Sequence, residues 1–466
     1  MPKILIVGGG YAGFYTAWKL EKWLTKGEAE VLMVDPRPYL TYQPFLPEVA
    51  AGSVEPRHTV VSQRRHLKRT TVLTASVTAI DHATKTATIT PECGDPYEFH
   101  YDIVVVTAGS VTRTFPIPGV ADTAIGLKNV EEATYIRDRL INNFARAAAL
   151  PADDARRARL LTVTVVGGGF AGIEAFAELL SLASALLRYF PQIDFDETKF
   201  HLVEALGRIM PEVSLPTSLW VIRNLQRRGG EVHLDTQLAS AVDGHVQLST
   251  GESYESDLIV WTAGVMASPM LRSTDLPVEE RGRLRVNTEL QVVTEEGEVV
   301  EGAWGAGDAS AVPDLSGMGV GGFCVPNAQH AVRQGKLLAR NLTAHLRGET
   351  PKTYFHKSIG AVAGLGLGVG VYTNGSKKVA LKGFIGWVMH RGYHGLAIPT
   401  WERKWRVIFG WIGQLFLRRD IVGLEGLGAP REQFEKYAAR PRPAAETAPQ
   451  SPAVTTGSVA REKAGV

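Results

Sequence analysis

The sequence contains almost no cysteine. Only Cys93 and Cys324 occur among its 466 residues, and they form no CxxC or longer paired spacing. We therefore expect no disulfide framework, no zinc or other metal site and no dithiol redox centre, and we expect a reducing compartment.

The chain also lacks an excess of charge and long hydrophobic runs. Fifty Lys and Arg residues stand against 48 Asp and Glu, a formal net charge of +2, which gives no sign of nucleic-acid binding. The apolar stretches at 359–372 and 407–417 fall short of the roughly 20 residues that a membrane-spanning helix needs. A strand pattern begins directly after Lys3, which predicts no signal peptide. We expect a globular protein that meets a membrane only at its cytoplasmic surface.

Glycine occurs in a pattern that the chain uses twice. The segments ILIVGGGYAGFYTAW (4–18) and TVTVVGGGFAGIEAF (162–176) each join an apolar run to a helical pattern through a GxGxxG motif. This motif predicts a buried parallel strand, a tight turn and a helix whose free N–H groups bind a pyrophosphate. The cofactor-binding residues expected here are Gly8, Gly10, Ala12 and Gly13 in the first copy, and Gly168, Gly169, Phe170, Ala171 and Gly172 in the second.

An acidic residue ends a later strand pattern in each copy. Asp35 follows Gly13 by 22 residues, and Glu204 follows Gly172 by 32. A carboxylate at this place accepts hydrogen bonds from a ribose and repels a 2′-phosphate, which favours NADH over NADPH. Arg208 nearby leaves NADPH open as the alternative.

Further similarities extend the repeat into two whole domains. The strand patterns YDIVVVTAGS (101–110) and ESDLIVWTAGV (255–265) both end in Ala-Gly, where small residues allow a cofactor to approach the backbone. The expected contacts are Ala108 and Gly109 in one domain and Ala263 and Gly264 in the other. Helices are predicted at 129–149 and from Asn327 onward. We predict an α/β fold with two nested Rossmann-like domains, one comprising 1–112 and 286–350 and the other, 113–285, inserted within it.

The C-terminal region, 351–430, has a different character. Between 376 and 419 nine Lys and Arg residues accompany a single acid, Glu402, and four of the nine tryptophans. Helical spacing aligns Trp401, Trp405, Ile408, Ile412 and Leu415 in one stripe. Such a basic amphipathic helix suits a membrane surface, and the alternative is a helix docked on the protein core or in a dimer interface. The tail, 431–466, is poor in aromatic residues and is expected to be disordered.

These features together resemble type II NADH dehydrogenases, the single-subunit NADH:quinone oxidoreductases. The resemblance extends over about residues 3–425 and is carried by YQPFLPEVAAG (42–52), GFAGIEAFAEL (169–179), AQHAVRQG (328–335) and the C-terminal segment. It implies FAD in the first site, NADH in the second, and a membrane quinone, menaquinone or ubiquinone, as the respiratory electron acceptor. It also implies a homodimer. The C-terminal segment predicts peripheral membrane association, and because no transmembrane channel or charged relay is visible we predict no proton pumping.

The resemblance assigns roles to particular residues. Glu174 is expected beside the nicotinamide and flavin as the proton-handling group, Gln329 as hydrogen-bond donor to the quinone, and Lys357 close to the flavin ring. Taken without the resemblance, Glu174 is more simply a carboxylate at a helix N-terminus and Lys357 a solvated lysine. The remaining expected FAD contacts are Asp35, Gln43, Pro44, Val77, Asp308 and Ala328, and Glu204 is expected on the NADH ribose.

One position departs from the family pattern and keeps other functions open. Arg333 stands where the family has a second glutamine, and the glutamine comes one residue later, at Gln334. Arg333 could bind a polar head group, close the quinone pocket or point to solvent. The alternatives are a redox sensor that binds NADH without turnover and a related reductase with another acceptor. Sulfide:quinone oxidoreductases and disulfide reductases are disfavoured because they need paired cysteines.

Overall fold

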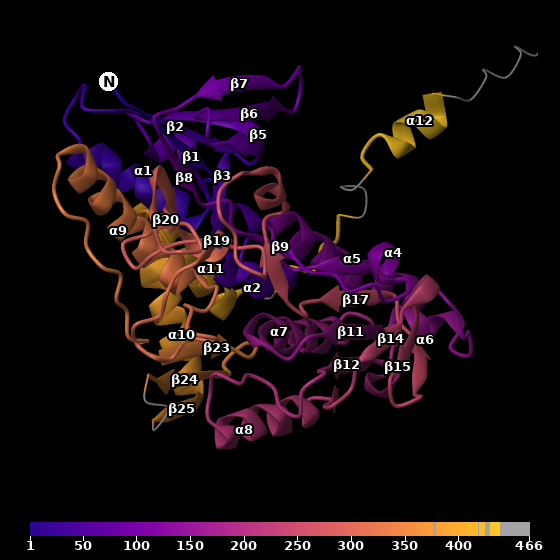
Figure 1. Cartoon of the computed structure of the whole chain (residues 1–466). Coiled ribbons are helices and arrows are strands. Elements are labelled where there is room, and N and C mark those ends of the chain that lie inside the picture. Colours follow the sequence, from indigo (N-terminus) through magenta and orange to yellow (C-terminus); the bar gives the residue numbers. More distant parts are fainter. Residues whose placement is uncertain (359, 376–378, 418, 425–428, 439–466) are drawn as a thin grey trace, which may run out of the picture. The chain divides into compact units, whose positions relative to one another are not determined.

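The computed structural model describes residues 1–358, 360–375, 379–417, 419–424 and 429–438 (Figure 1). Residues 1–423 form one compact unit, and 424–466 form a second one that is described separately below. Among the described residues no helix has both the length and the apolar character required to cross a bilayer.

The first domain is built on an eight-stranded sheet. The strand order is β20-β21-β8-β1-β2-β5-β6-β7, with a parallel centre in which β1 pairs with β2 and β8. Helices α1 (Tyr11–Trp23) and α9 (Ala328–Leu346) lie against each other beside it (Figure 1). The strands are β1 (Lys3–Val7), β2 (Glu30–Asp35), β5 (Thr71–Asp81), β6 (Thr86–Pro91), β7 (Tyr97–His100), β8 (Ile103–Val106), β20 (Gln291–Val293) and β21 (Val299–Gly305).

The second domain is built on a five-stranded parallel sheet. Its order is β10-β17-β11-β12-β13, and α5 (Val130–Ala148), α7 (Phe170–Leu186) and α8 (Leu215–Gln226) contact its strands. The strands are β10 (Ala124–Gly126), β11 (Thr162–Val166), β12 (Lys199–Val203), β13 (Gly230–His233) and β17 (Leu258–Trp261), and a small antiparallel sheet comprises β14 (Leu238–Ser240), β15 (His245–Leu248) and β16 (Ser253–Glu255).

The order of the strands explains how the two domains are nested. β21 follows the whole second sheet in the sequence, yet it pairs in parallel with β8, which precedes that sheet. The first sheet therefore draws strands from both sides of the second. Short elements complete the unit: β3 (Tyr39–Thr41), β4 (Val60–Ser62), β9 (Ser110–Thr112), β18 (Val265–Ala267), β19 (Leu284–Arg285), β22 (Ser310–Ala311), α2 (Leu46–Ala50), α3 (Gln63–His66), α4 (Val120–Thr123) and α6 (Arg156–Leu160).

Local sequence accounts for the central strands and the two predicted helices. β1 and β11 are buried along nearly their whole length, as expected of parallel strands covered on both faces. The side chain of Asn129 accepts a hydrogen bond from the Glu132 N–H and begins α5. Asn327 begins α9 in the same way, through the His330 N–H. Both helix predictions are confirmed.

The C-terminal region adds a three-stranded antiparallel sheet and two helices. The sheet comprises β23 (Gly360–Gly364), β24 (Gly370–Asn374) and β25 (Ala380–Gly383), and α10 (Phe384–Ala397) packs on it. Helix α11 (Trp401–Phe416) buries Val407 against the body and exposes Trp401, Trp405, Phe409, Ile412 and Phe416.

The predicted stripe on α11 needs one correction. Trp401, Trp405 and Ile412 are exposed together as expected, but Ile408 is half-buried and Phe409 takes its place on the exposed face. The reason is that Val407 and Trp411 define the side that contacts the body, which turns Ile408 toward it. The side chain of Leu415 lies outside the described residues.

The second unit contains one described helix, α12 (Glu432–Ala438). An ion pair between Arg431 and Glu435, 3.2 Å apart and one turn from each other, supports it locally. This helix lies within the stretch 431–466 for which the sequence predicts disorder. The rest of that stretch, 439–466, lies outside the described residues.

Candidate active site

The turn between β1 and α1 leaves an open space in front of a helix. Gly8 has a φ of +97°, and a Cβ there would lie 2.5 Å from the Thr107 carbonyl oxygen. A Cβ on Gly13 would lie 1.9 Å from the carbonyl oxygen of Gly8. At Gly10, by contrast, a Cβ would meet nothing within 4 Å, and α1 begins there without a side-chain cap. An uncapped helix start facing open space fits the pyrophosphate of a dinucleotide.

The turn between β11 and α7 repeats these features. Gly167 has a φ of +111°, and a Cβ on Gly172 would lie 1.9 Å from the Gly167 oxygen. Gly169 begins α7 without a side-chain cap, and a Cβ there would meet nothing within 4 Å. The residues of the two turns thus fit two dinucleotides in the same way.

In each domain, the acidic residue at the end of the second strand accepts hydrogen bonds from backbone N–H groups, one of which belongs to the glycine turn. Asp35 accepts hydrogen bonds from the N–H groups of Gly9 at 2.6 Å and Arg37 at 2.7 Å. Burial raises the pKa of the Asp35 carboxyl, and these two hydrogen bonds partly offset the rise. Glu204 accepts from the Gly168 N–H at 2.5 Å and the Leu206 N–H at 2.8 Å. Both carboxylates therefore lie beside the glycine turns, where a bound ribose is expected.

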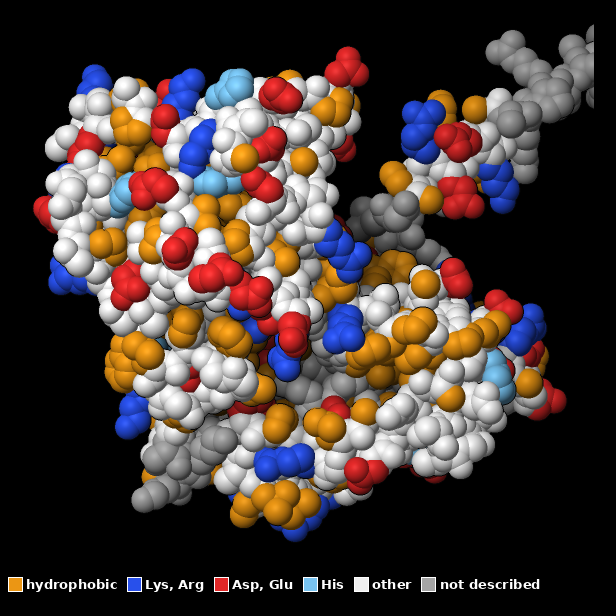
Figure 2. Space-filling view, in the orientation of Figure 1, with side chains coloured by type: hydrophobic (Ala, Val, Ile, Leu, Met, Phe, Trp, Pro, Cys, Tyr) orange, Lys and Arg blue, Asp and Glu red, His pale blue; other side chains and the backbone are white. Residues whose placement is uncertain are grey.

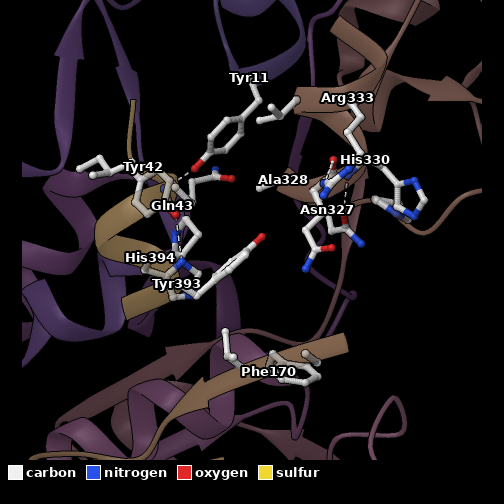
Figure 3. Close-up of a pocket in the computed structure, with 18 of the residues that line it drawn as sticks. Tyr11, Tyr42, Gln43, Phe170, Asn327, Ala328, His330, Arg333, Tyr393 and His394 are labelled. Atoms are coloured by element: carbon white, nitrogen blue, oxygen red, sulfur yellow. Dashed lines mark hydrogen bonds between the residues drawn. The ribbon is translucent and has the colours of Figure 1, made fainter. Parts of the chain in front are cut away.

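A large cleft runs between the two domains. Its volume is about 1520 Å³, and Figure 2 shows the surface hollowed between the domains. The cleft reaches the start of the exposed face of α11, since Leu396 and Trp401 also line it. Figure 3 shows Tyr11, Tyr42, Gln43, Tyr393 and His394 on one side, Asn327, Ala328, His330 and Arg333 on the other, and Phe170 across the opening.

The cleft brings together only part of the expected site residues. Those that line it are Gln43, Pro44, Phe170, Ala171, Glu174, Gly264, Ala328 and Gln329. The two glycine turns and the carboxylates of Asp35 and Glu204 lie outside the cleft lining, at the carboxyl ends of the parallel strands. Val77 is buried in β5, three residues beyond Thr74, the partner of Asp35. Lys357 is exposed, whereas its neighbours His356 and Ser358 line the cleft.

Hydrogen bonds hold the wall that contains Gln43. The Gln43 N–H donates to the Tyr11 hydroxyl at 3.1 Å, and Gln43 Nε2 donates to the Lys128 carbonyl oxygen at 3.0 Å. The Tyr42 hydroxyl lies 2.9 Å from His394 Nδ1. Burial raises the pKa values of the Tyr11 and Tyr42 hydroxyls well above 10, so both keep their protons at neutral pH.

Asp308 lies at the centre of a polar cluster between the sheet and α9. Ser110 Oγ donates to Asp308 Oδ2 at 2.7 Å, and Lys128 Nζ lies 3.8 Å from the same oxygen. Gln334, buried in α9, accepts a hydrogen bond from the Gly307 N–H at 2.8 Å and so fixes the turn that presents Asp308. The sequence shows Gln334 only as a glutamine displaced by one residue from the family pattern, and its place within AQHAVRQG is the signal for this role.

Arg333 lies in the cleft lining. It is half-buried, and its Nη1 donates to the Gln329 carbonyl oxygen, one turn earlier in α9, at 2.9 Å. This bond keeps the guanidinium close to the helix and leaves the cleft open beside it. A positive charge therefore forms part of the wall.

Glu174 belongs to a buried ionic network that the sequence did not reveal. Its Oε1 accepts from the Gly364 N–H at 2.8 Å and lies 3.3 Å from His390 Nε2. His390 Nδ1 in turn lies 3.8 Å from Glu48 Oε1. Burial alone would lower the pKa of His390, but Glu174 and Glu48 outweigh it and the pKa is raised. His390 and Glu48 were missed, although Glu48 stands in the motif YQPFLPEVAAG.

A second group of contacts anchors this network. Arg391 Nη2 lies 3.5 Å from Glu48 Oε2, and Trp411 Nε1 donates to the same oxygen at 3.0 Å. The Arg391 guanidinium lies between the rings of Trp387 and Trp411, 4.7 Å from each centroid. Glu48 thus joins α2, α10 and α11 beneath the cleft.

The two cysteines do not contribute a redox pair. Cys93 is exposed and Cys324 is buried, and both are free. Burial raises the pKa of the Cys324 thiol to about 11, so it stays protonated at neutral pH.

Comparison with known proteins identifies the family of the chain. Residues 2–335 match the pyridine nucleotide-disulphide oxidoreductase family. A probable NADH dehydrogenase of Dictyostelium discoideum is 27% identical over 426 residues, which cover 90% of each chain. The type II NADH:quinone oxidoreductase Ndh of Mycobacterium tuberculosis is 26% identical over 429 residues, 88% of this chain and 87% of that one.

A structural relative supports the same fold. NDH2 from Plasmodium falciparum, solved in complex with NADH, matches with a TM-score of 0.81 and 18% identity, over 90% of this chain and 99% of that one. The predicted α/β fold and the family resemblance are confirmed, and with them FAD and a pyridine nucleotide as the cofactors of the family. The chain therefore belongs to the pyridine nucleotide-disulphide oxidoreductase family.

Proposed function

We propose that this protein is a non-proton-pumping NADH:quinone oxidoreductase of type II. The observation that carries the proposal is that one continuous cleft extends from Phe170 at the start of α7 to Trp401 at the exposed apolar face of α11. A nicotinamide brought in by the second domain and a lipid-borne acceptor can thus reach one space. FAD, which the start of α1 and Asp35 of the first domain would hold, would supply the redox chemistry that carries two electrons from NADH to a quinone.

The second domain binds NADH through its helix start and its acid. The N–H groups at the start of α7 receive the pyrophosphate, and Glu204 accepts from the ribose hydroxyls. Arg208 is held by backbone, with Nη2 donating to the Val213 carbonyl oxygen at 2.7 Å, so it is not free to bind a 2′-phosphate. This arrangement supports NADH over NADPH.

Glu204→Ala is expected to raise the KM for NADH by about 10- to 100-fold with little change in kcat, because a hydrogen bond to a charged group is worth about 1.5–3 kcal/mol. Steady-state kinetics with a soluble quinone measures both constants. Glu255→Gln, which alters an exposed carboxylate of the same domain, is the control and should leave them unchanged. An unaltered KM in Glu204→Ala would remove this residue from the ribose site.

Reduction of a quinone requires two protons, and the buried network can supply them. We assign Glu174 as the proton-handling group of the cleft, with His390 and Glu48 behind it. Gln329 is assigned as a hydrogen-bond donor to the quinone carbonyl, and Lys357 as a residue near the flavin ring. The roles given to Glu174, His390, Glu48, Gln329 and Lys357 are proposals. Glu174 and Gln329 are supported by their place in the cleft lining, and His390 and Glu48 by their place beneath it.

The decisive experiment is anaerobic stopped-flow spectroscopy of the purified flavoprotein. NADH should bleach the flavin absorbance rapidly, and subsequent mixing with a short-chain quinone should restore it. Glu174→Gln is expected to slow the second phase more than the first. Rapid reduction without reoxidation by any quinone would favour the redox sensor, and reoxidation only by a protein acceptor would favour a related reductase.

The exposed face of α10 and α11 supports attachment to a membrane surface. Apolar side chains point away from the body on both helices, with Arg406 exposed beside them. Such a face, with aromatic and basic residues together, binds at the lipid headgroup level. Its exposed apolar residues are Phe384, Ile385, Val388, Met389, Leu396, Trp401, Trp405, Phe409, Ile412 and Phe416. Location at the cytoplasmic face of the cell membrane remains a prediction. A homodimer also remains a prediction, and light scattering measures the mass of the particle in solution.

Replacing Trp405, Phe409 and Phe416 together by serine is expected to lower the vesicle partition coefficient at least about 100-fold, because each large apolar side chain contributes about 1.5–3 kcal/mol when fully buried. Sedimentation with anionic lipid vesicles measures the partition coefficient. Trp23→Ser, at a partly exposed tryptophan of α1, is the matched control. Undiminished binding by the triple variant would place the membrane contact elsewhere.

A further inference from the structure

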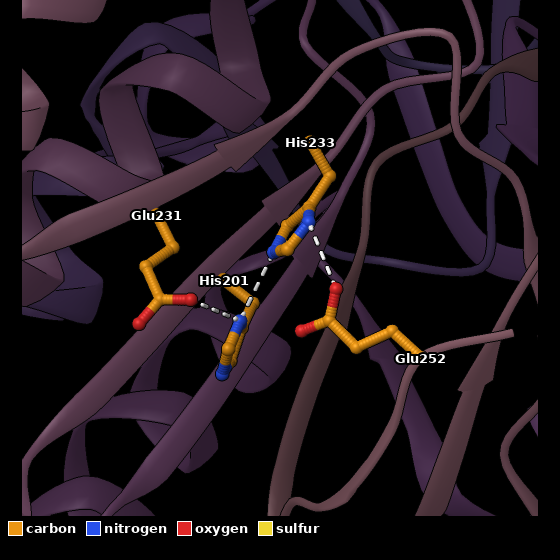
Figure 4. A group of neighbouring side chains, drawn as sticks. All are labelled: His201, Glu231, His233 and Glu252. Carbon is orange, nitrogen blue, oxygen red and sulfur yellow. Dashed lines mark hydrogen bonds and ion pairs between the residues drawn. The ribbon is translucent and has the colours of Figure 1, made fainter. Parts of the chain in front are cut away.

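Four side chains of metal-binding type gather in the second domain, outside the cleft. His201 comes from β12, Glu231 and His233 from β13, and Glu252 from the turn between β15 and β16 (Figure 4). One ligand atom from each residue lies within 4.8 Å of the others. The sheet explains the grouping: His201 is the register partner of Glu231, and His233 lies two residues further along the same face. The sequence predicts no metal site because its two cysteines are unpaired, and that pattern gives no information on these His and Glu residues, which are far apart along the chain.

The distances match those between the ligands of a tetrahedral metal ion. His201 Nδ1 lies 3.1 Å from His233 Nε2 and 3.5 Å from Glu231 Oε2. Metal–ligand bonds of about 2.0–2.1 Å, as for zinc, put neighbouring tetrahedral ligand atoms about 3.3 Å apart. His201 Nδ1 therefore lies at the spacing of tetrahedral neighbours from both His233 Nε2 and the Glu231 carboxylate, and all the ligand atoms lie within 4.8 Å of one another.

Glu252 has a different position in the cluster. Its Oε2 lies 3.7 Å from His233 Nδ1, the ring nitrogen that faces away from His201. A carboxylate near the far nitrogen favours a proton on Nδ1, which leaves the lone pair on Nε2, the nitrogen that faces His201. The ring of Tyr254 stacks on that of His201, with centroids 3.9 Å apart, and holds it in place.

A plain hydrogen bond between two histidines explains less of this arrangement. Such a bond accounts for the 3.1 Å contact but not for the two carboxylates that lie 3.5 Å from His201 Nδ1 and 3.7 Å from His233 Nδ1. Neutral imidazoles with carboxylates beside them are the donor set that zinc prefers. The side chains of Glu231 and Glu252 are 48% and 46% exposed, which gives an ion access from solvent.

We propose that His201, His233 and Glu231 bind one divalent transition-metal ion, with zinc the best fit, and that Glu252 is the carboxylate behind His233 that supports its ring electrostatically. The fourth position faces solvent and suits a water molecule. The ion joins β12 to β13 just where the His233 carbonyl oxygen accepts the Glu204 N–H at 2.9 Å. If the proposed function holds, the metal thereby stiffens the strand end that contacts the NADH ribose.

Zinc content of the flavoprotein tests the site without any use of activity. Protein stripped with a chelator is dialysed against micromolar zinc, and zinc per flavin is measured by mass spectrometry. We expect His201→Gln, His233→Gln and Glu231→Gln each to hold one zinc fewer than the unaltered protein. Glu252→Gln should weaken binding by about 10- to 100-fold and not abolish it.

His245→Gln is the matched control. His245 is exposed on β15 of the same domain and pairs with Glu255 at 2.8 Å, outside the cluster. The His245→Gln variant should hold as much zinc as the unaltered protein. Equal zinc in all variants, or no zinc in the unaltered protein, would overturn the proposal. Glu231→Gln covers the case in which a histidine variant misfolds, because Glu231 is half-exposed.

Cobalt provides a second readout. Cobalt(II) bound tetrahedrally by two imidazoles and a carboxylate gives visible absorption bands at longer wavelength than the flavin. These bands should appear in the unaltered protein and in His245→Gln and be absent from Glu231→Gln. Their presence in Glu231→Gln would place the ion at another site.

Discussion

Gly169→Val is expected to give a folded, yellow flavoprotein that NADH reduces at least about 100-fold more slowly at low NADH concentration. Gly169 has an extended backbone that valine can adopt, and a Cβ there meets nothing within 4 Å, so the fold is preserved. The new side chain instead enters the space in front of α7 where the pyrophosphate is expected. Loss of two hydrogen bonds to charged oxygens, at about 1.5–3 kcal/mol each, gives this magnitude.

Two further glycine variants separate this effect from misfolding. Gly10→Val, the equivalent change in the first domain, should remove the flavin and leave a colourless protein. Gly172→Val should fail to fold, because its Cβ would lie 1.9 Å from the Gly167 oxygen and 2.5 Å from Thr262 Oγ1. Absorbance spectra and anaerobic stopped-flow traces report all three results. Normal reduction of Gly169→Val would show that NADH binds elsewhere.

Glu48→Ala is expected to lower the free energy of unfolding by about 3–5 kcal/mol, the usual effect of removing one partner from a buried ion pair. Glu48 is 3% exposed, and its loss leaves Arg391 buried without its carboxylate. The indole N–H of Trp411 loses its acceptor as well. The helices α10 and α11 should therefore loosen from the body.

Urea unfolding followed by tryptophan fluorescence measures this change. Glu402→Ala is the control, because Glu402 forms ion pairs with Arg406 at 3.1 Å and with Arg65 at 3.3 Å at the surface. Such exposed pairs contribute less than about 1 kcal/mol. A Glu48 variant as mild as the Glu402 variant would show that the buried network contributes little to stability.

The sequence by itself determined the parts of the protein that are built locally. Each glycine turn depends on a strand, a turn and a helix that are adjacent in the chain, so GxGxxG followed by Asp35 or Glu204 was sufficient to predict it. The starts of α5 and α9 were predictable for the same reason, because Asn129 and Asn327 bond to N–H groups only three residues away.

Only the tertiary structure decided which distant side chains meet. Glu48, Glu174 and His390 come from α2, α7 and α10, and no spacing in the sequence relates them. His201 and His233 meet because β12 and β13 pair in one particular register. The outward face of α11 was likewise set by Val407 and Trp411 against the body. Periodicity reports which side of an element is apolar, whereas sheet register and helix packing determine what that side contacts.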